Sequence, residues 1–268
     1  MDAGARAWEV RFKEAARGQF QKELKDLLAA LKRNGEGKAI DEGDLFSRQG
    51  TPISYQRFLL DIGHLVEVWG AEWRSLYHPL LRAYTIAQGR TIAASFGISF
   101  DMGNAATIAW LEQYTMTFAQ ALMGVTEQSV RDRIIQGQSE GWSIPQMTDS
   151  LTELYRGWSE ERAETIARTE TIRSSNAGSQ QVYQQAGIER KQWLAAMDPC
   201  EFCGEMEDRY GPNTEGIGVE EIFYPVGSDM TVGEGEEVRR ITFDYEDVYH
   251  PPLHPNCRCT ILPVIERS

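Results

Sequence analysis

The sequence has no long uncharged apolar run. Its most apolar stretch, residues 59–70, is interrupted by Asp61, His64 and Glu67, whereas a membrane-spanning helix needs about 18 or more apolar residues. The first residues, Met-Asp-Ala-Gly-Ala-Arg, lack the apolar core of a secretion signal. We therefore expect an acidic, soluble protein that makes no membrane contact and is not exported by the ordinary route.

Basic residues are scarce relative to acidic ones. The chain has 27 Lys and Arg against 40 Asp and Glu, a net charge of −13. A protein whose main task is to wrap a nucleic-acid backbone needs a basic surface, so we expect any DNA contact to be secondary. The hydrophobic share of 41% is enough for a core, and 268 residues fit one large domain or two ordinary ones.

Cysteine is absent from the first 199 residues, and proline is rare there. All four cysteines and seven of the ten prolines occur from residue 199 onward. Residues 191–268 also hold 16 acidic and 6 basic residues, a net of −10. This change of composition predicts a domain boundary near Gly187.

Before that boundary, apolar residues recur at helical spacing. Over residues 5–32 they form one stripe that predicts a helix, and Asn34-Gly35 supplies a stop. Residues 35–54 are predicted to be a loop. The stripe has two interpretations: a mobile arm that docks in a partner's groove, or a face that packs on residues 55–123.

Further helices are predicted downstream. Residues 55–96 are expected to be helical with a break near Pro79, and residues 104–123 form the next helix, with Asn104 as its cap. Ser143 and Gln146 have the spacing of a capping box. Ser159 is predicted to begin a last helix, which ends at Gly187.

After the boundary, apolar residues alternate in three short segments, 193–197, 241–245 and 257–261. Alternation favours half-buried strands, and the glycines between them favour loops. The predicted fold class is therefore α+β: a mostly helical N-terminal part followed by a small, loop-rich, metal-clipped domain with short strands. About 80 irregular residues bury little surface, so this part needs a staple.

The staple is predicted to be a structural zinc ion. Cys200 and Cys203 are separated by two residues and Cys257 and Cys259 by one, and His254 lies just before the second pair. Four thiolates, or three with the histidine, suit the tetrahedral preference of Zn²⁺.

Other interpretations of the cysteines are disulfides, a redox pair, or free buried thiols. Stable disulfides are rare in a reducing cytosol, and Asp198-Pro199 is not the context of a redox motif. His250 either supports the metal ligands or is an ordinary loop residue.

Several short motifs of the chain resemble one protein family. They are Ile166-Ala167-Arg168-Thr169-Glu170-Thr171, then Asn176, Gly178, Tyr183, Gly187, Trp193 and Asp198, and finally His254-Pro255-Asn256-Cys257-Arg258-Cys259 with Pro263. This series resembles the phage Mu F-like head morphogenesis family, the minor head proteins of tailed bacteriophages. The resemblance covers roughly residues 125–265, and the closing HPNCRC is its most specific part.

The resemblance implies a protein present in few copies in the procapsid near the portal, which influences head assembly and the packaged DNA or its ejection. Its partners would be the portal protein and other head or scaffolding proteins. Its location would be the virion, and the host cytoplasm during assembly. The predicted parts are residues 1–124, an N-terminal helical region; 125–187, the helical part of the family domain; and 188–268, its zinc-clipped part.

An enzyme is not expected. The runner-up function is a metal-dependent nuclease of the treble-clef type, suggested by His254 and Asn256 beside cysteine pairs. That site needs a helix with further ligands after the second pair, whereas this chain has only nine residues after Cys259. Prolines around His250 and His254 also exclude the helix that usually presents an HxxxH pair.

The polar residues of the first motif have two interpretations. Arg168, Thr169 and Glu170, together with Asn176, could form a solvated helix face with a weak ion pair. Alternatively, they form a patch that docks the helix onto the cysteine-rich part, with Asn176 bonded to loop backbone. The second interpretation is the one we expect.

Overall fold

The computed structural model describes residues 3–35, 55–233 and 235–265. It divides into two compact units, each assembled from separate stretches of the chain. One consists of residues 1–12, 78–117 and 165–268, and the other of residues 13–77 and 118–164. The boundaries at residues 124 and 187 that the sequence suggests stay a prediction. In the described part, no helix has the length and apolar character to cross a membrane.

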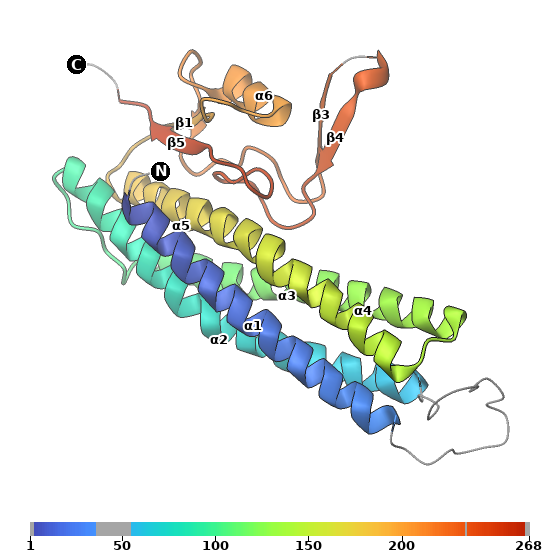
Figure 1. The fold of residues 1–268 in the computed structure, drawn as a ribbon. Coiled ribbons are helices and arrows are strands. Elements are labelled where there is room, and N and C mark those ends of the chain that lie inside the picture. Colours follow the sequence, from blue (N-terminus) through green and yellow to red (C-terminus); the bar gives the residue numbers. More distant parts are fainter. Residues whose placement is uncertain (1–2, 36–54, 234, 266–268) are drawn as a thin grey trace. The chain divides into compact units, whose positions relative to one another are not determined.

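Helices make up most of the chain (Figure 1). They are α1 (Ala3–Gly35), α2 (Tyr55–Ser95), α3 (Ala105–Glu140), α4 (Ile144–Gly157) and α5 (Ala163–Gln185), with a π-helical turn at Trp158–Arg162 between the last two. The end of α1 at Gly35 agrees with the predicted stop, and the predicted loop at residues 35–54 lies outside the described residues except for Gly35 itself. Gly187 has a φ of +70°, the left-handed conformation expected just after a helix.

The predicted caps are present. The side-chain oxygen of Asn104 accepts hydrogen bonds from the backbone N–H groups of Ala106 and Thr107, at 2.9 and 3.4 Å. Gln146 Oε1 accepts from the backbone N–H of Ser143 at 2.8 Å, so the capping box forms.

The predicted docking arm is wrong. The stripe of α1 is buried: Phe20 and Leu27 have no exposed surface. Phe20 packs edge-on against Trp73 of α2, with ring centroids 5.3 Å apart, and lies 6.5 Å from Tyr155 of α4. The alternative interpretation, packing on the following helices, is the one found, because a stripe this apolar gains most from burial inside its own unit.

Two predicted helix boundaries are also wrong. Pro79 lies inside α2, which is continuous from Tyr55 to Ser95. Tyr77 and Leu81 on either side are fully buried, and this packing offsets the hydrogen bond that proline removes. No helix begins at Ser159, because the backbone continues helically from α4 through the π-helical turn into α5.

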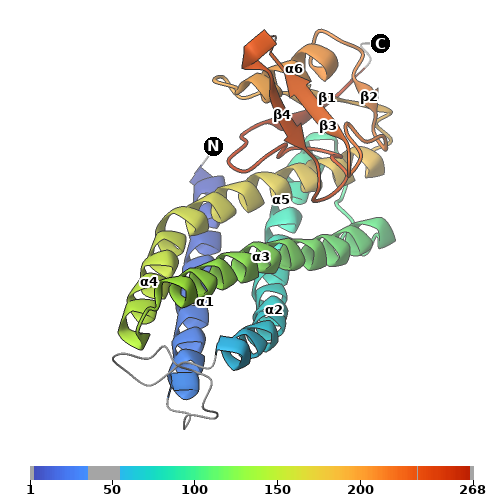
Figure 2. The same ribbon diagram turned by 90° about the vertical axis from the view of Figure 1, so that its right-hand side faces the viewer.

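The described C-terminal part contains short strands, one α-helix and a 3-10 helical turn at Gly235–Glu237. The strands and the α-helix are β1 (Arg190–Leu194), α6 (Glu201–Tyr210), β2 (Ile217–Gly218), β3 (Asp229–Val232), β4 (Arg239–Thr242) and β5 (Thr260–Pro263). The first sheet has the order β2-β1-β5 and is antiparallel, with Trp193 opposite Ile261; β3 and β4 form a second, two-stranded sheet. Figures 1 and 2 place α6 and these strands on one side of α5. The α+β fold class is thus confirmed.

The observed strands overlap the predicted segments only in part. The first strand ends at Leu194, and Met197 is fully exposed. Cys257 and Cys259 precede β5, in a loop. Their side chains are buried although the backbone is not paired as a strand. Two buried residues separated by one exposed residue therefore gave the sequence pattern of a strand.

Candidate metal centre

The start of α6 positions the first cysteine pair. Cys200 is the residue before the helix, with extended backbone angles of φ −72° and ψ 166°, and Cys203 lies in the first turn. The backbone N–H of Gly204 donates to the carbonyl of Cys200 at 2.9 Å, which closes that turn. Residues three apart on a helix lie on one face, so both sulfurs face the same space.

A tight turn before β5 positions the remaining candidates. Asn256 has a φ of +64°, a left-handed conformation that asparagine tolerates better than most residues. The turn is closed by the N–H of Cys257, which donates to the carbonyl of His254 at 3.1 Å. This turn brings the loop that carries His254, Cys257 and Cys259 close to Cys203.

The tautomer of His254 suits metal binding. Its Nδ1 lies 2.8 Å from the carbonyl oxygen of Pro255, so Nδ1 carries the proton and donates it to that oxygen. The other nitrogen, Nε2, then has its lone pair available, and it lies 3.1 Å from Cys200 Sγ and 3.3 Å from Cys203 Sγ. Metal-ligating histidines are commonly held by such a bond from the second nitrogen.

All five predicted ligands come together, in two overlapping groups. Cys200, Cys203 and His254 form one group, and Cys203, Cys257 and Cys259 form the other; in each, the ligand atoms lie within 4.8 Å of one another. Cys203 and Cys257 have their sulfurs 3.7 Å apart, close to the edge of about 3.8 Å expected between thiolates on tetrahedral zinc. A disulfide requires about 2.05 Å, and the four cysteines are free.

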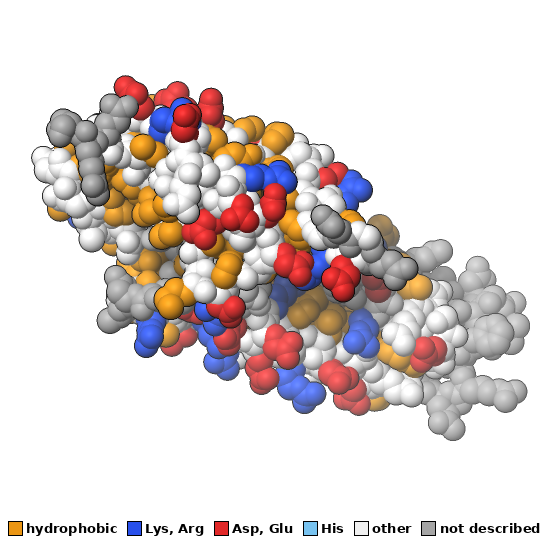
Figure 3. Space-filling model, turned by 90° about the horizontal axis from the view of Figure 1, so that it is seen from above, with side chains coloured by type: hydrophobic (Ala, Val, Ile, Leu, Met, Phe, Trp, Pro, Cys, Tyr) orange, Lys and Arg blue, Asp and Glu red, His pale blue; other side chains and the backbone are white. Residues whose placement is uncertain are grey.

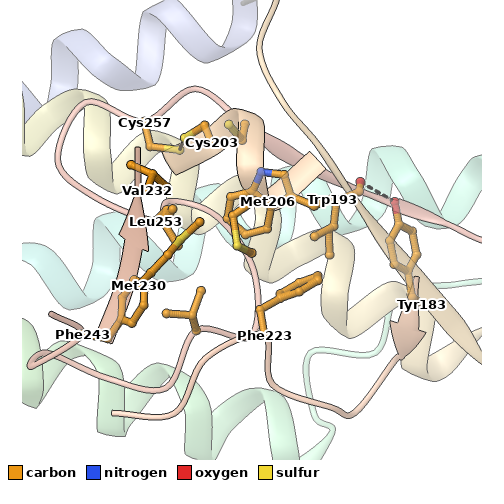
Figure 4. Close-up of a cluster of buried hydrophobic side chains, with 13 residues drawn as sticks. Tyr183, Trp193, Cys203, Met206, Phe223, Met230, Val232, Phe243, Leu253 and Cys257 are labelled. Atoms are coloured by element: carbon orange, nitrogen blue, oxygen red, sulfur yellow. Dashed lines mark hydrogen bonds between the residues drawn. The ribbon is translucent and has the colours of Figure 1, made fainter. Parts of the chain in front are cut away.

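The sulfurs lie at the edge of a hydrophobic cluster. Cys203, Cys257 and Cys259 are each 2% exposed, while Cys200 is exposed. Figure 4 shows Cys203 and Cys257 within the same cluster as Trp193 and Met206. Hydrogen bonds with Cys257 and Cys259, together with burial, raise the pKa of the Cys203 thiol. A cation would be needed to hold all these sulfurs as thiolates, so the donor set fits a thiophilic metal such as zinc.

Helix α5 contacts the cysteine loop through the polar patch. The side-chain amide of Asn176 donates to the carbonyl of Cys259 at 3.2 Å, and its oxygen accepts from the N–H of Ile261 at 3.0 Å. Thr169 Oγ1 accepts from the N–H of Asn256 at 3.1 Å. The docking interpretation is confirmed for Thr169 and Asn176, which are buried and bond the cysteine loop. Arg168 is half-buried, and its Nη1 lies 3.5 Å from Asn256 Oδ1. Glu170 is also buried, but its carboxylate accepts a hydrogen bond from Tyr114 of α3.

Some polar contacts between α5 and the C-terminal part were not found from the sequence. Thr165 Oγ1 lies 3.3 Å from Asn256 Nδ2, 91 positions away. Arg173 forms an ion pair with Glu246, 73 positions away. No local spacing signals such pairs. His250, considered as support for the metal ligands, is outside both metal groups, and its Nδ1 bonds the carbonyl of Pro251 at 2.8 Å.

The comparison with protein families gives one match. The family described as "Phage Mu protein F like protein" matches residues 128–262, just over half of the chain. The chain belongs to the phage Mu protein F-like family. The curated proteins and the solved structures gave no match.

Membership in the phage Mu protein F-like family suggests a function related to the phage head, in contact with other head components and located in the virion. The matched range runs from within α3 to within β5 and contains all five metal-ligand candidates. The centre therefore lies within the region that defines the family. Residues 1–127 lie outside the match.

Proposed function

We propose that this protein is a minor head protein that acts in procapsid assembly near the portal, by binding and not by catalysis. The match to the phage Mu protein F-like family over residues 128–262 carries this proposal. The portal is favoured over the shell because the family resemblance implies few copies per head. An influence on packaged DNA, or on its ejection, follows from that position.

Zinc is the metal that we propose for the centre. Cys203 belongs to both groups, and Cys200, His254, Cys257 and Cys259 supply the other positions. When bound, zinc would cross-link the start of α6 to the loop before β5 and stabilise a region with short strands. Five protein donors for four tetrahedral positions leave none open to water or substrate, whereas a catalytic zinc keeps one open.

Charge supports protein partners over DNA. Residues 191–268 have a net charge of −10. Their two adjacent arginines are partnered: Arg239 lies 3.4 Å from Glu201, and Arg240 pairs with Asp229. On the face drawn in Figure 3, basic side chains are scattered among acidic ones and do not merge into a continuous patch. A phosphate backbone would meet mostly repulsion there.

The proposal is tested by counting copies of this protein in procapsids that assemble with and without the portal protein. Quantitative mass spectrometry of purified procapsids should find it when the portal is present and not when the portal is absent. Equal incorporation in both would contradict the portal assignment.

The absence of catalysis is tested separately. The same protein, loaded with zinc, should leave plasmid DNA intact with Mg²⁺ or Mn²⁺. Cleavage that His254→Ala removes in a folded variant would favour the nuclease.

A further inference from the structure

A cavity of about 310 Å³ lies beside α3, apart from the cysteines. Trp110 and Tyr114 of α3 form one side, and residues 245–250 form much of the other. Its volume is near the lower end for ligand pockets, which suits a single side chain or a small molecule. None of its lining residues is a candidate metal ligand.

Aromatic rings form the walls. Trp110 and Tyr114 are stacked, with centroids 5.5 Å apart and planes 4° from parallel. Tyr245 meets Tyr114 edge-on at 6.2 Å, and His250 meets Trp110 in the same way at 6.2 Å. Tyr249 at the rim is 40% exposed. Faces of such rings attract cations.

The rings that line the cavity already contact two cations. Lys191 Nζ lies 5.6 Å from the centroid of Tyr249. The guanidinium carbon of Arg173 lies 5.0 Å from the centroid of Tyr114 and 5.5 Å from that of Tyr245. Arg173 does not itself line the cavity.

The polar groups that line the cavity include several acceptors. His250 is 6% exposed, and its Nδ1–H is used by the carbonyl of Pro251. Burial lowers the pKa of His250 to about 3, so the ring is neutral and Nε2 is an acceptor. No hydrogen bond to this nitrogen occurs among the described residues. Asp247 accepts the N–H of Val226 at 2.8 Å through one oxygen, and its charge faces the same cavity.

Negative charge around the cavity exceeds positive charge. Glu246 and Asp247 line the cavity, and Glu170 lies beside it against Tyr114. The guanidinium of Arg173 pairs with Glu170 and Glu246. Burial raises the pKa of Glu170 to about 7, so this carboxyl supplies only part of a negative charge. Among the residues that the structure describes, the other cation close to these rings is Lys191, whose Nζ donates to the carbonyl of Tyr249 at 2.9 Å. Burial lowers the pKa of Lys191 to about 7, so it supplies only part of a charge. A further cation would stabilise the buried carboxylates in their ionised form.

We propose that this cavity binds an alkylguanidinium or alkylammonium group, between the aromatic walls and against His250 Nε2 and the Asp247 carboxylate. Such a group is carried by an arginine or lysine side chain of a partner protein, and also by a free polyamine. The inference does not depend on zinc or on the portal.

The test is a titration of the full chain followed by NMR. The signal of the Trp110 indole N–H, assigned with Trp110→Phe, should shift and saturate with N-butylguanidinium. It should respond little to N-butylurea, which has a similar shape and no charge. Asp247→Asn should weaken binding by about threefold, while Asp244→Asn, which removes an exposed charge outside the cavity lining, should not.

A comparison of butylammonium with spermidine at one ionic strength distinguishes the two sources. Similar affinities support a single side chain as the occupant, and much tighter spermidine binding supports a polyamine. The proposal is overturned if N-butylurea binds as well as N-butylguanidinium. It is equally overturned if no ligand shifts the signal, or if Asp244→Asn and Asp247→Asn weaken binding alike.

Discussion

Asn176 joins helix α5 to the loop that contains Cys257 and Cys259. Asn176 is 2% exposed, and its amide group bonds Cys259, Ile261 and Thr260 at 2.9 to 3.2 Å. Both ends of the amide are used, one as donor and one as acceptor. A buried group with both functions satisfied cannot be replaced without leaving backbone atoms unpartnered.

Replacement of Asn176 should therefore destabilise the fold. We expect Asn176→Ala to lower the free energy of unfolding by about 1–3 kcal/mol, because it leaves the N–H of Ile261 and the carbonyl of Cys259 without partners. Urea denaturation measures this. Asn213→Ala, at an exposed loop position, is the matched control and should change stability by less than about 0.5 kcal/mol.

A buried glutamate, Glu23, makes the stability of the unit formed by residues 13–77 and 118–164 depend on pH. Glu23 has no exposed surface, and its Oε1 accepts from Trp73 Nε1 at 2.5 Å. Burial raises the pKa of Glu23 to about 7, partly opposed by Trp73 and Arg162. Burial likewise raises the pKa of Glu170 in the other unit to about 7.

The pKa of Glu23 is higher in the folded chain than in the unfolded chain. Between about pH 4.5 and 7, the Glu23 carboxyl is therefore protonated in the folded state and ionised in the unfolded state. Stability should then fall as the pH rises through this window. Glu23→Gln should reduce this fall, by on the order of 2–3 kcal/mol, and leave the part due to Glu170. Unfolding free energies at pH 5 and 8 measure it. An equal fall in Glu23→Gln and in exposed Glu14→Gln would contradict the prediction.

At the scale of elements, helix α5 approaches α2 closely at one glycine. A Cβ at Gly178 would lie 3.1 Å from the carbonyl oxygen of Thr85 and 3.2 Å from the nitrogen of Gly89. The contacting atoms belong to backbone, which cannot move aside as a flexible side chain does. The small residue thus sets the distance between the two helices, in the unit to which both segments belong.

A larger residue at this position should separate the helices. We expect Gly178→Val to lower the free energy of unfolding by about 1–3 kcal/mol, because overpacking forces the backbone apart. Gly204→Ala in α6, where a Cβ meets nothing within 4 Å, should be neutral or stabilise by up to about 1 kcal/mol. Thermal unfolding of both variants measures this, and a Gly178→Val variant as stable as the parent would refute the close contact.

At the scale of the whole molecule, we expect the proposed metal and the helices to stabilise different regions. The helices bury extended aromatic faces. The region from β1 to β5 instead has short strands around a hydrophobic cluster that includes Cys203, Cys257 and Cys259. Stability should therefore be unequal along the chain, with the cysteine region dependent on the cross-link.

Removal of the metal should loosen residues 190–263 before the helices. We expect purified protein to hold about one zinc ion per chain, and a chelator to speed amide hydrogen exchange in α6 and β5 while α1 is unchanged. Cys203→Ser should lose the metal if the ligand set contains either group in full, because Cys203 belongs to both groups. Metal-free protein with the exchange pattern of the parent would contradict the zinc staple.

The sequence by itself indicated the helical stretches before residue 187, the α+β class, the family and the five metal-ligand candidates. These depend on local periodicity and on motifs such as HPNCRC, which require no knowledge of distant contacts. The sequence did not indicate α6 or the extension of α3 to Glu140. The tertiary structure decided the rest. It kept α2 intact through Pro79, buried the stripe of α1, and placed Arg173 beside Glu246 and Asn176 beside Cys259. Each of these depends on residues dozens of positions apart, because burial and pairing follow from packing in space and leave no spacing signal in the chain.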